Sequence, residues 1–273
     1  MRSVTLIAPA LLMSALLCPA NTLTDPFGQA QTNCNYSANA PYSACDVIGD
    51  PQLYDIQSAT FSIAGGMATV MISLNTGAAQ NVNNQLVLGP FNDAGVTLIP
   101  GDILFYDPNT PYDPANPSTS QNLQYGVALT NHGFFTAGGL YNITGSVSVE
   151  NAETALNNST DYYRKDEDVL LAGSGTPASM GSVSVAANPN GNGTTIANYV
   201  ITATFPTTTA FLSLVSNGQI GLLFSSADCG NDVIEGAVGP QTAQAPEPSP
   251  AFMMLTGVVL LIGGCAWRKH TAR

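Results

Sequence analysis

The residues best suited to chemistry lie in one acidic stretch near the middle of the chain. Three carboxylates and an amide fall within twelve positions, at Asp102, Asp107, Asn109 and Asp113. Calcium takes about six to eight oxygen ligands from carboxylates, amides and the backbone carbonyls of turns. The stretch therefore predicts a calcium site where a strand passes into a loop. The spacing is not that of an EF-hand, and a proline-rich Asx turn uses the same residue types without a metal.

Groups that could catalyse hydrolysis are sparse. Sugar hydrolysis needs two carboxyl groups across a cleft, and none of the four glutamates between residues 25 and 235 lies in a Glu-x-Asp-x-Glu strand. A serine nucleophile needs an elbow such as Gly-x-Ser-x-Gly, which is absent, and His132 is interpreted as a turn residue beside a strand. The sequence favours a protein that is not an enzyme. A hydrolase with an unrecognised site is kept as a third hypothesis, after the two non-catalytic functions given at the end of this section.

Sugar binding asks for exposed aromatic rings with polar neighbours. The candidate rings are Tyr106, Tyr112, Tyr125, Phe134, Phe135, Tyr162 and Tyr163. We expect Tyr162 and Tyr163 to be exposed as a ligand-binding pair, because they stand beside Arg164 and Lys165 in a charged loop. The other rings are expected mainly in strand packing.

Short runs rich in Val, Ile, Thr, Tyr and Phe follow one another between Gly, Pro, Asn and Asp turns, and residues 149–159 form the sole weak helix candidate. Two alternating runs flank Gly65-Gly66, which predicts a β-hairpin. This pattern predicts an all-β, antiparallel β-sandwich of jelly-roll or lectin-like form over residues 51–240. The predicted strands are 56–63, 68–74, 85–88, 102–106, 124–130, 141–149, 168–171, 181–186, 195–205, 210–215 and 219–225.

The central region is strongly acidic. Of the 18 acids, 17 lie between Asp25 and Glu235, where the bases are Arg164 and Lys165, so this part carries 2 − 17 = −15 formal charges. Nucleic-acid affinity depends largely on Lys and Arg displacing counterions. Nucleic acid is therefore excluded as a partner.

Both ends carry the marks of export. Residues 1–20 have one early positive charge, a short apolar run and a small residue at Ala20, which predicts a secretory signal peptide; a cut near Ala30 is the alternative. A polar, irregular segment with two cysteines follows at 21–50.

Once the signal peptide and the C-terminal tail are removed, Cys34, Cys45 and Cys229 remain. In an oxidising compartment we expect one disulfide among these three. Two segments are similar in sequence, Cys45-Asp-Val-Ile-Gly and Cys229-Gly-Asn-Asp-Val-Ile-Glu-Gly. The similarity suggests that Cys45 pairs with Cys229, and the competing pair is Cys34 with Cys45.

Three sequence elements follow one another at the C-terminal end. A proline-rich linker, 241–250, contains Pro246-Glu247-Pro248, residues 251–267 lack charge, and the basic tail, 268–273, carries Arg268, Lys269 and Arg273. Seventeen residues make a helix about 25 Å long, slightly shorter than the ~30 Å hydrocarbon core. We expect a C-terminal transmembrane helix with its tail in the cytoplasm.

This end resembles the PEP-CTERM sorting signal of Gram-negative envelope proteins over about the last 28 residues. The resemblance implies recognition and processing by an exosortase, and residence at the cell surface or in the exopolysaccharide matrix. Many members of the family have a denser arginine cluster. A permanent membrane anchor is the alternative.

These observations together predict an exported cell-surface or extracellular-matrix protein with a non-catalytic structural or adhesive role. Its expected partners are the processing enzyme, exopolysaccharide and, before processing, the membrane. The alternative function is a calcium-assisted carbohydrate-binding module.

Overall fold

The protein is built mainly of antiparallel β-strands. The structure, a computed structural model, describes residues 20–24, 55–76, 79–82, 85–88, 99–110, 122–155, 168–193, 196–216, 218–226 and 232–240. All of them belong to one compact unit, Ala20–Gln241. The predicted all-β class is confirmed. No helix among the described residues is long and apolar enough to cross a membrane, and the predicted helix at 251–267 lies outside them.

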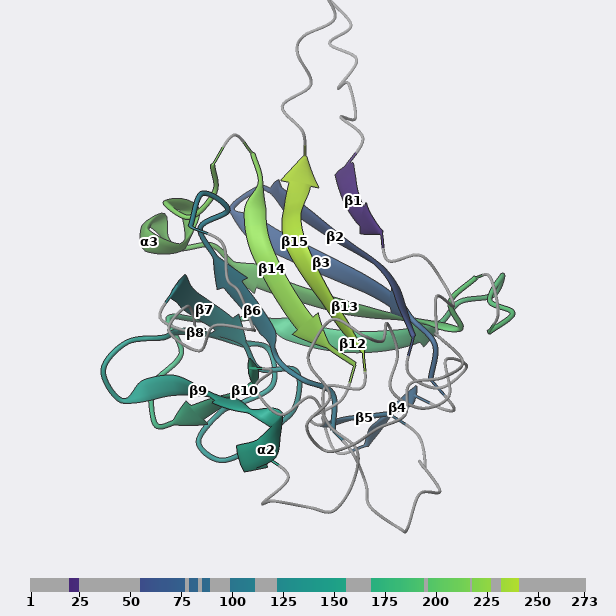
Figure 1. The fold of residues 1–273 in the computed structure, drawn as a ribbon, viewed down its shortest axis with the longest axis horizontal. Helices are drawn as coiled ribbons and strands as arrows, with labels where there is room; N and C mark the ends of the chain where they lie inside the picture. The colour runs from purple at the N-terminus through teal and green to yellow at the C-terminus, as the bar shows by residue number, and fades with distance from the viewer. Residues whose placement is uncertain are drawn as a thin grey trace, which may run out of the picture. The chain divides into compact units, whose positions relative to one another are not determined.

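Eleven strands form one sheet in the order β11-β8-β7-β6-β14-β15-β1-β2-β3-β13-β12 (Figure 1). Two separate pairs, β9 with β10 and β4 with β5, make small sheets of their own. The strands are β1 (Ala20–Thr24), β2 (Ile56–Ala64), β3 (Met67–Leu74), β4 (Ala79–Val82), β5 (Gln85–Leu88), β6 (Ile103–Tyr106), β7 (Leu123–Val127), β8 (Gly139–Asn142), β9 (Val147–Asn151), β10 (Asp168–Gly173), β11 (Ser179–Met180), β12 (Ser182–Ala187), β13 (Tyr199–Pro206), β14 (Ile220–Ser225) and β15 (Val233–Pro240); the short helices are α2 (Ala152–Ala155) and α3 (Thr209–Leu212).

The predicted hairpin is the β2–β3 pair. Gly65 and Gly66 have φ values of 58° and 79°. A two-residue hairpin turn of type I′ requires positive φ at both central residues, and glycine adopts such values without a steric penalty. The turn sets Ala64 opposite Met67. In β3 the buried side chains alternate with more exposed ones, so one face of the hairpin enters the core.

Aromatic side chains from distant strands fill that core. Phe105 on β6 lies 6.0 Å from Phe205 on β13 and 5.3 Å from Phe211 on α3, measured between ring centroids. Phe61 on β2 lies 6.5 Å from Phe105. Because β6 is far from β2 and β13 in the strand order, these contacts require the sheet to fold so that its two halves face each other. The result is a sandwich-like arrangement around one core.

Two short segments join the halves. Strand β1 pairs with β15 through Ala20 and Asn21, and with β2 through Thr22 to Thr24. On the other side, β11 pairs with β8, β12 pairs with β13, and Gly181 alone separates β11 from β12. A β-carbon at Gly181 would lie 2.0 Å from the carbonyl oxygen of Thr204. The chain can turn this corner because glycine has no side chain.

Three predicted elements differ from the structure. Residues 210–215 were expected to be a strand, but 209–212 form α3, because the Thr208 hydroxyl caps the Phe211 amide and Phe211 is fully buried. The predicted strand 141–149 is divided by a turn at Gly145, where φ is 65°. The helix candidate 149–159 begins as strand β9, 152–155 form α2, and 156–159 lie outside the described residues.

Four observed strands, β1, β4, β11 and β15, were not predicted. β15 contains Gly236, Gly239 and Pro240, which are poor strand formers, yet it pairs with β14 along six residues. Tertiary pairing therefore outweighs local propensity at this strand.

Replacing Gly181 by alanine should lower the free energy of unfolding by about 1–3 kcal/mol, the usual cost of forcing a methyl group into an occupied site. The measurement is urea-induced unfolding. Ser184→Ala on β12, whose side chain is exposed, is the control and should change stability by less than about 0.5 kcal/mol. Equal stabilities for the two variants would show that the corner tolerates a β-carbon.

Candidate functional site

The structure separates the predicted calcium ligands. Asp102 directly precedes β6 and Asp107 directly follows it, a span of about 16 Å at 3.3 Å per residue. Asp102 is 1% exposed, whereas Oδ1 of Asp107 accepts hydrogen bonds from the backbone and side-chain nitrogens of Asn109 in an Asx turn. Asp113 lies outside the described residues. Calcium binding thus stays a prediction for the Asp107 turn, and Asp102 is not part of that turn.

Within the described part of the chain, no three residues of the types His, Cys, Asp and Glu are grouped so that they could hold a metal ion.

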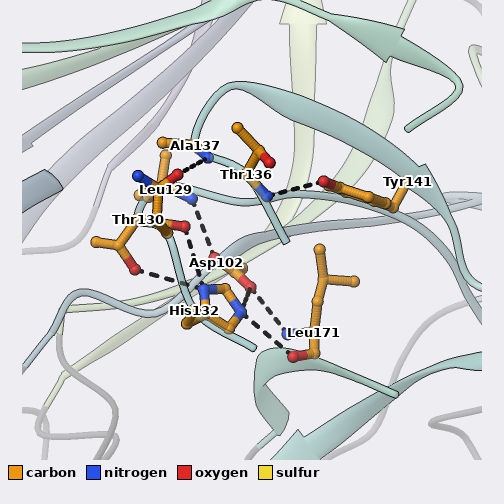
Figure 2. Close-up of polar contacts among 9 residues, drawn as sticks. Asp102, Leu129, Thr130, His132, Thr136, Ala137, Tyr141 and Leu171 are labelled. Carbon is orange, nitrogen blue, oxygen red and sulfur yellow. Dashed lines mark hydrogen bonds and ion pairs between the residues drawn. The ribbon is translucent and has the colours of Figure 1, made fainter. Parts of the chain in front are cut away.

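Asp102 is the centre of a buried polar junction (Figure 2). Its Oδ1 accepts a hydrogen bond from the Leu129 amide at 3.0 Å, and its Oδ2 accepts one from the Leu171 amide at 2.8 Å. Nε2 of His132 lies 3.1 Å from the same Oδ2. One carboxylate thus joins the start of β6 to the end of β7 and to β10.

Both ring nitrogens of His132 face oxygen atoms. Nδ1 lies 3.2 Å from the Thr130 carbonyl oxygen, and Nε2 lies 3.3 Å from the Leu171 carbonyl oxygen as well as facing Asp102. A neutral imidazole has one N–H and can satisfy acceptors on one side only. A doubly protonated His132 satisfies the oxygens on both sides, whereas with Nε2 alone protonated Nδ1 can accept from the Thr130 hydroxyl, 3.4 Å away.

The electrostatics agree with this pairing. Burial lowers the pKa of His132 and is the largest single effect, but the hydrogen bond and charge of Asp102, with the carbonyls of Thr130 and Leu171, together raise the pKa above its ordinary value of 6.5. The pKa of the Glu150 carboxyl is also raised above 4.5; burial is the main cause, His132 opposes it and Asp102 adds to it. Glu150 therefore responds to the charges of this junction.

The backbone around Asp102 is equally constrained. The Asp102 amide donates to the Val169 carbonyl at 2.8 Å, and the Gly101 amide donates to the Ser225 carbonyl at 3.2 Å. A β-carbon at Gly101 would lie 2.9 Å from that Ser225 oxygen. These contacts hold β10 and the end of β14 against the segment that enters β6.

The junction suits a structural role better than proton transfer. The His132 nitrogens and both Asp102 oxygens are directed at groups of the protein itself, and the neighbouring Thr130 is 1% exposed. A general base needs a nitrogen or oxygen within hydrogen-bond reach of the group that it deprotonates. In this structure each ring nitrogen and each carboxylate oxygen of the pair faces a group of the protein, which favours the structural role.

A second polar contact lies between β6 and β15. The Tyr106 hydroxyl donates to Oε1 of Glu235 at 3.3 Å. Burial, followed by the charge and hydrogen bond of Glu235, raises the pKa of Tyr106 well above its ordinary range. Tyr106 therefore stays protonated, which agrees with packing and hydrogen bonding rather than acid–base work.

The starts of β2 and β15 lie together. The Ile56 amide donates to Oδ2 of Asp232 at 2.5 Å, and the Ser226 amide donates to the Asp232 carbonyl at 2.9 Å. This contact joins β2, which follows the first of the two similar cysteine segments, to the second segment, which runs into β15. Cys45 and Cys229 lie outside the described residues, so their disulfide stays a prediction.

The structure sorts the described aromatic candidates for sugar binding. Tyr106, Tyr125 and Phe135 are buried at 3%, 5% and 4% exposure, whereas Phe134 is 74% exposed. Tyr112, Tyr162 and Tyr163 lie outside the described residues, as do all the predicted sorting residues from Pro246 to Arg273.

The chain matches no protein-family model, no curated protein and no solved structure.

Replacing Asp102 by asparagine should lower the free energy of unfolding by about 3–5 kcal/mol, because it leaves a buried amide N–H and the partly buried His132 ring without the carboxylate. Urea unfolding measures the change. Asp107→Asn, the same substitution at the exposed end of β6, is the control and should cost less than about 0.5 kcal/mol. Similar losses of stability in both variants would contradict the proposed contribution of Asp102 to the stability of the domain.

The stability of the protein should depend on pH through His132. Because the folded state raises the pKa of His132, the contribution is complete below 6.5, the ordinary value, and is lost as pH rises through the folded pKa. Unfolding measured from pH 6 to pH 9 should show this fall in the native chain and in Glu150→Gln. His132→Gln should lack it; an unchanged slope in that variant would assign the pH dependence elsewhere.

Proposed function

We propose that the protein is exported and displayed at the surface, or in the extracellular matrix, of a Gram-negative bacterium, where it has a non-catalytic structural or adhesive role. The observation that carries the proposal is the succession of three sequence elements at the C-terminal end: Pro246-Glu247-Pro248, the uncharged segment 251–267 and the basic tail 268–273. An exosortase-type enzyme is the proposed processing partner, and the membrane holds the chain before processing.

Strand β1 supports a signal peptide that ends at Ala20. A cut there leaves Asn21 to Thr24, the residues that pair with Gly239 on β15 and with Ser58 to Thr60 on β2. A cut near Ala30 would remove the whole strand. We therefore propose Asn21 as the first residue of the mature chain.

The junction around Asp102 supports a non-catalytic role. Its carboxylate and the His132 imidazole bond to segments of the same domain and hold three strands together. The strong negative charge of the central region suits an exposed, well-solvated protein, because net charge opposes non-specific association.

The alternative function is a calcium-assisted carbohydrate-binding module. The exposed Phe134 ring favours sugar binding, and the Asp107 turn with Asp113 is the proposed calcium site. Loss of polysaccharide binding in chelator and in Asp107→Ala would support this alternative.

Intact-mass analysis of the protein recovered from the native cell envelope and medium tests the sorting proposal. We expect a chain that begins at Asn21 and ends near Pro246-Glu247-Pro248. Changing this motif to three alanines should leave the tail in place and shift the protein to the membrane fraction, whereas Pro250→Ala in the same linker should be processed normally. A native chain that retains Trp267 and Arg273 would instead indicate a permanent anchor.

A further inference from the structure

Phe134 stands at the tip of a tight turn and presents its ring to solvent. The amide of His132 donates to the Phe135 carbonyl at 3.2 Å, and the Phe135 amide donates back to the His132 carbonyl at 2.8 Å. Two residues, Gly133 and Phe134, connect these positions, and Gly133 adopts a φ of 49°. Among the described large apolar side chains, Phe134 is the most exposed, at 74%.

The base of this turn is held from both sides. His132 contacts Asp102 and the Leu171 carbonyl, as described above. Phe135 is buried, with its ring centroid 5.4 Å from that of His132 and 4.8 Å from that of Tyr141. The Tyr141 hydroxyl in turn accepts a hydrogen bond from the Thr136 amide (Figure 2). Phe135 therefore anchors the turn in the domain while its neighbour Phe134 points away from it.

Polar residues flank Phe134 in the sequence. Asn131 and Thr136, on either side of the turn, are exposed, and Oδ1 of Asn131 accepts a hydrogen bond from the Ala137 amide at 2.8 Å. An aromatic ring on a braced turn loses little conformational freedom when a ligand stacks on it. The tip thus presents one exposed apolar ring on a braced backbone, with polar residues beside it in the sequence.

A sugar unit matches this combination. A pyranose has an apolar C–H face that can cover one aromatic ring, and hydroxyl groups that reach polar neighbours. A stable protein interface needs about 800 Å² on each partner, much more than the roughly 200 Å² of one aromatic side chain. The 15 net negative charges between Asp25 and Glu235 repel acidic polymers, so a neutral polysaccharide is the better ligand.

We propose that the turn from His132 to Phe135 is a binding site for a neutral polysaccharide, with the Phe134 ring stacked on a sugar face. The site deepens the adhesive part of the proposed function, and rests on it for the presence of matrix polysaccharide. It needs no metal and lies away from the Asp107 turn in sequence.

Affinity electrophoresis of the full-length chain in detergent, through gels containing dextran, starch or galactomannan, tests the site. We expect at least one of these neutral polymers to retard the native chain, and alginate, which is acidic, to leave it unretarded. Phe134→Ala should weaken the binding about tenfold, the loss of roughly one stacking contact. Phe134→Trp should bind at least as well as the native chain.

Leu212→Ala is the matched control, since Leu212 is another exposed apolar side chain, on α3, and this variant should bind like the native chain. Circular dichroism must show that Phe134→Ala is folded. The proposal is overturned if no neutral polymer binds, if Phe134→Ala binds normally, if alginate binds better, or if chelator abolishes binding. Capture of a protein through Phe134 without polysaccharide binding also overturns it.

This test is independent of sorting, because it reads binding and not the chain termini. A chain that is processed as proposed but binds no neutral polymer contradicts the Phe134 site alone. A chain that binds through Phe134 but is recovered from the native cell envelope with its tail intact contradicts the sorting proposal alone.

Discussion

The buried Asp102 carboxylate is the constraint on which much of the domain depends. Removing a carboxylate from water costs several kcal/mol unless hydrogen bonds and an opposite charge compensate it. Here the amides of Leu129 and Leu171 and the ring of His132 provide that compensation. Leu129 and His132 come from the stretch that follows β7, and Leu171 comes from β10, so the carboxylate is satisfied only when these two segments are assembled against the start of β6.

The same junction links the core to the exposed turn. On one side β6 contributes Phe105 to the aromatic contacts that join the two halves of the sheet. On the other side His132 braces the turn that carries Phe134. A rigid core and a presented side chain therefore share one set of hydrogen bonds, so the packing of the core also fixes the position of the turn.

The sequence predicted the features that depend on local pattern, and missed those that depend on pairing across the fold. The β2–β3 hairpin follows from alternation about its Gly-Gly turn, and β5 and β14 follow from short runs of strand-forming residues between turn residues. The Asp102–His132 pair could have been found only from the β6–β7 register, which sets Ile103 opposite Val127. Asp102 was instead grouped with its neighbours in sequence, and the exposure of Phe134 over Phe135 depends on which ring enters the core.

Amide hydrogen exchange in the native chain and in Asp102→Asn, resolved by residue, tests the central claim most directly. The account predicts that the Leu129 and Leu171 amides are protected in the native chain and lose protection together in the variant, because one side chain accepts both bonds. The β2–β3 amides should keep their order of protection. Unchanged protection of Leu129 and Leu171 in a folded variant would contradict the claim that Asp102 holds these strands together.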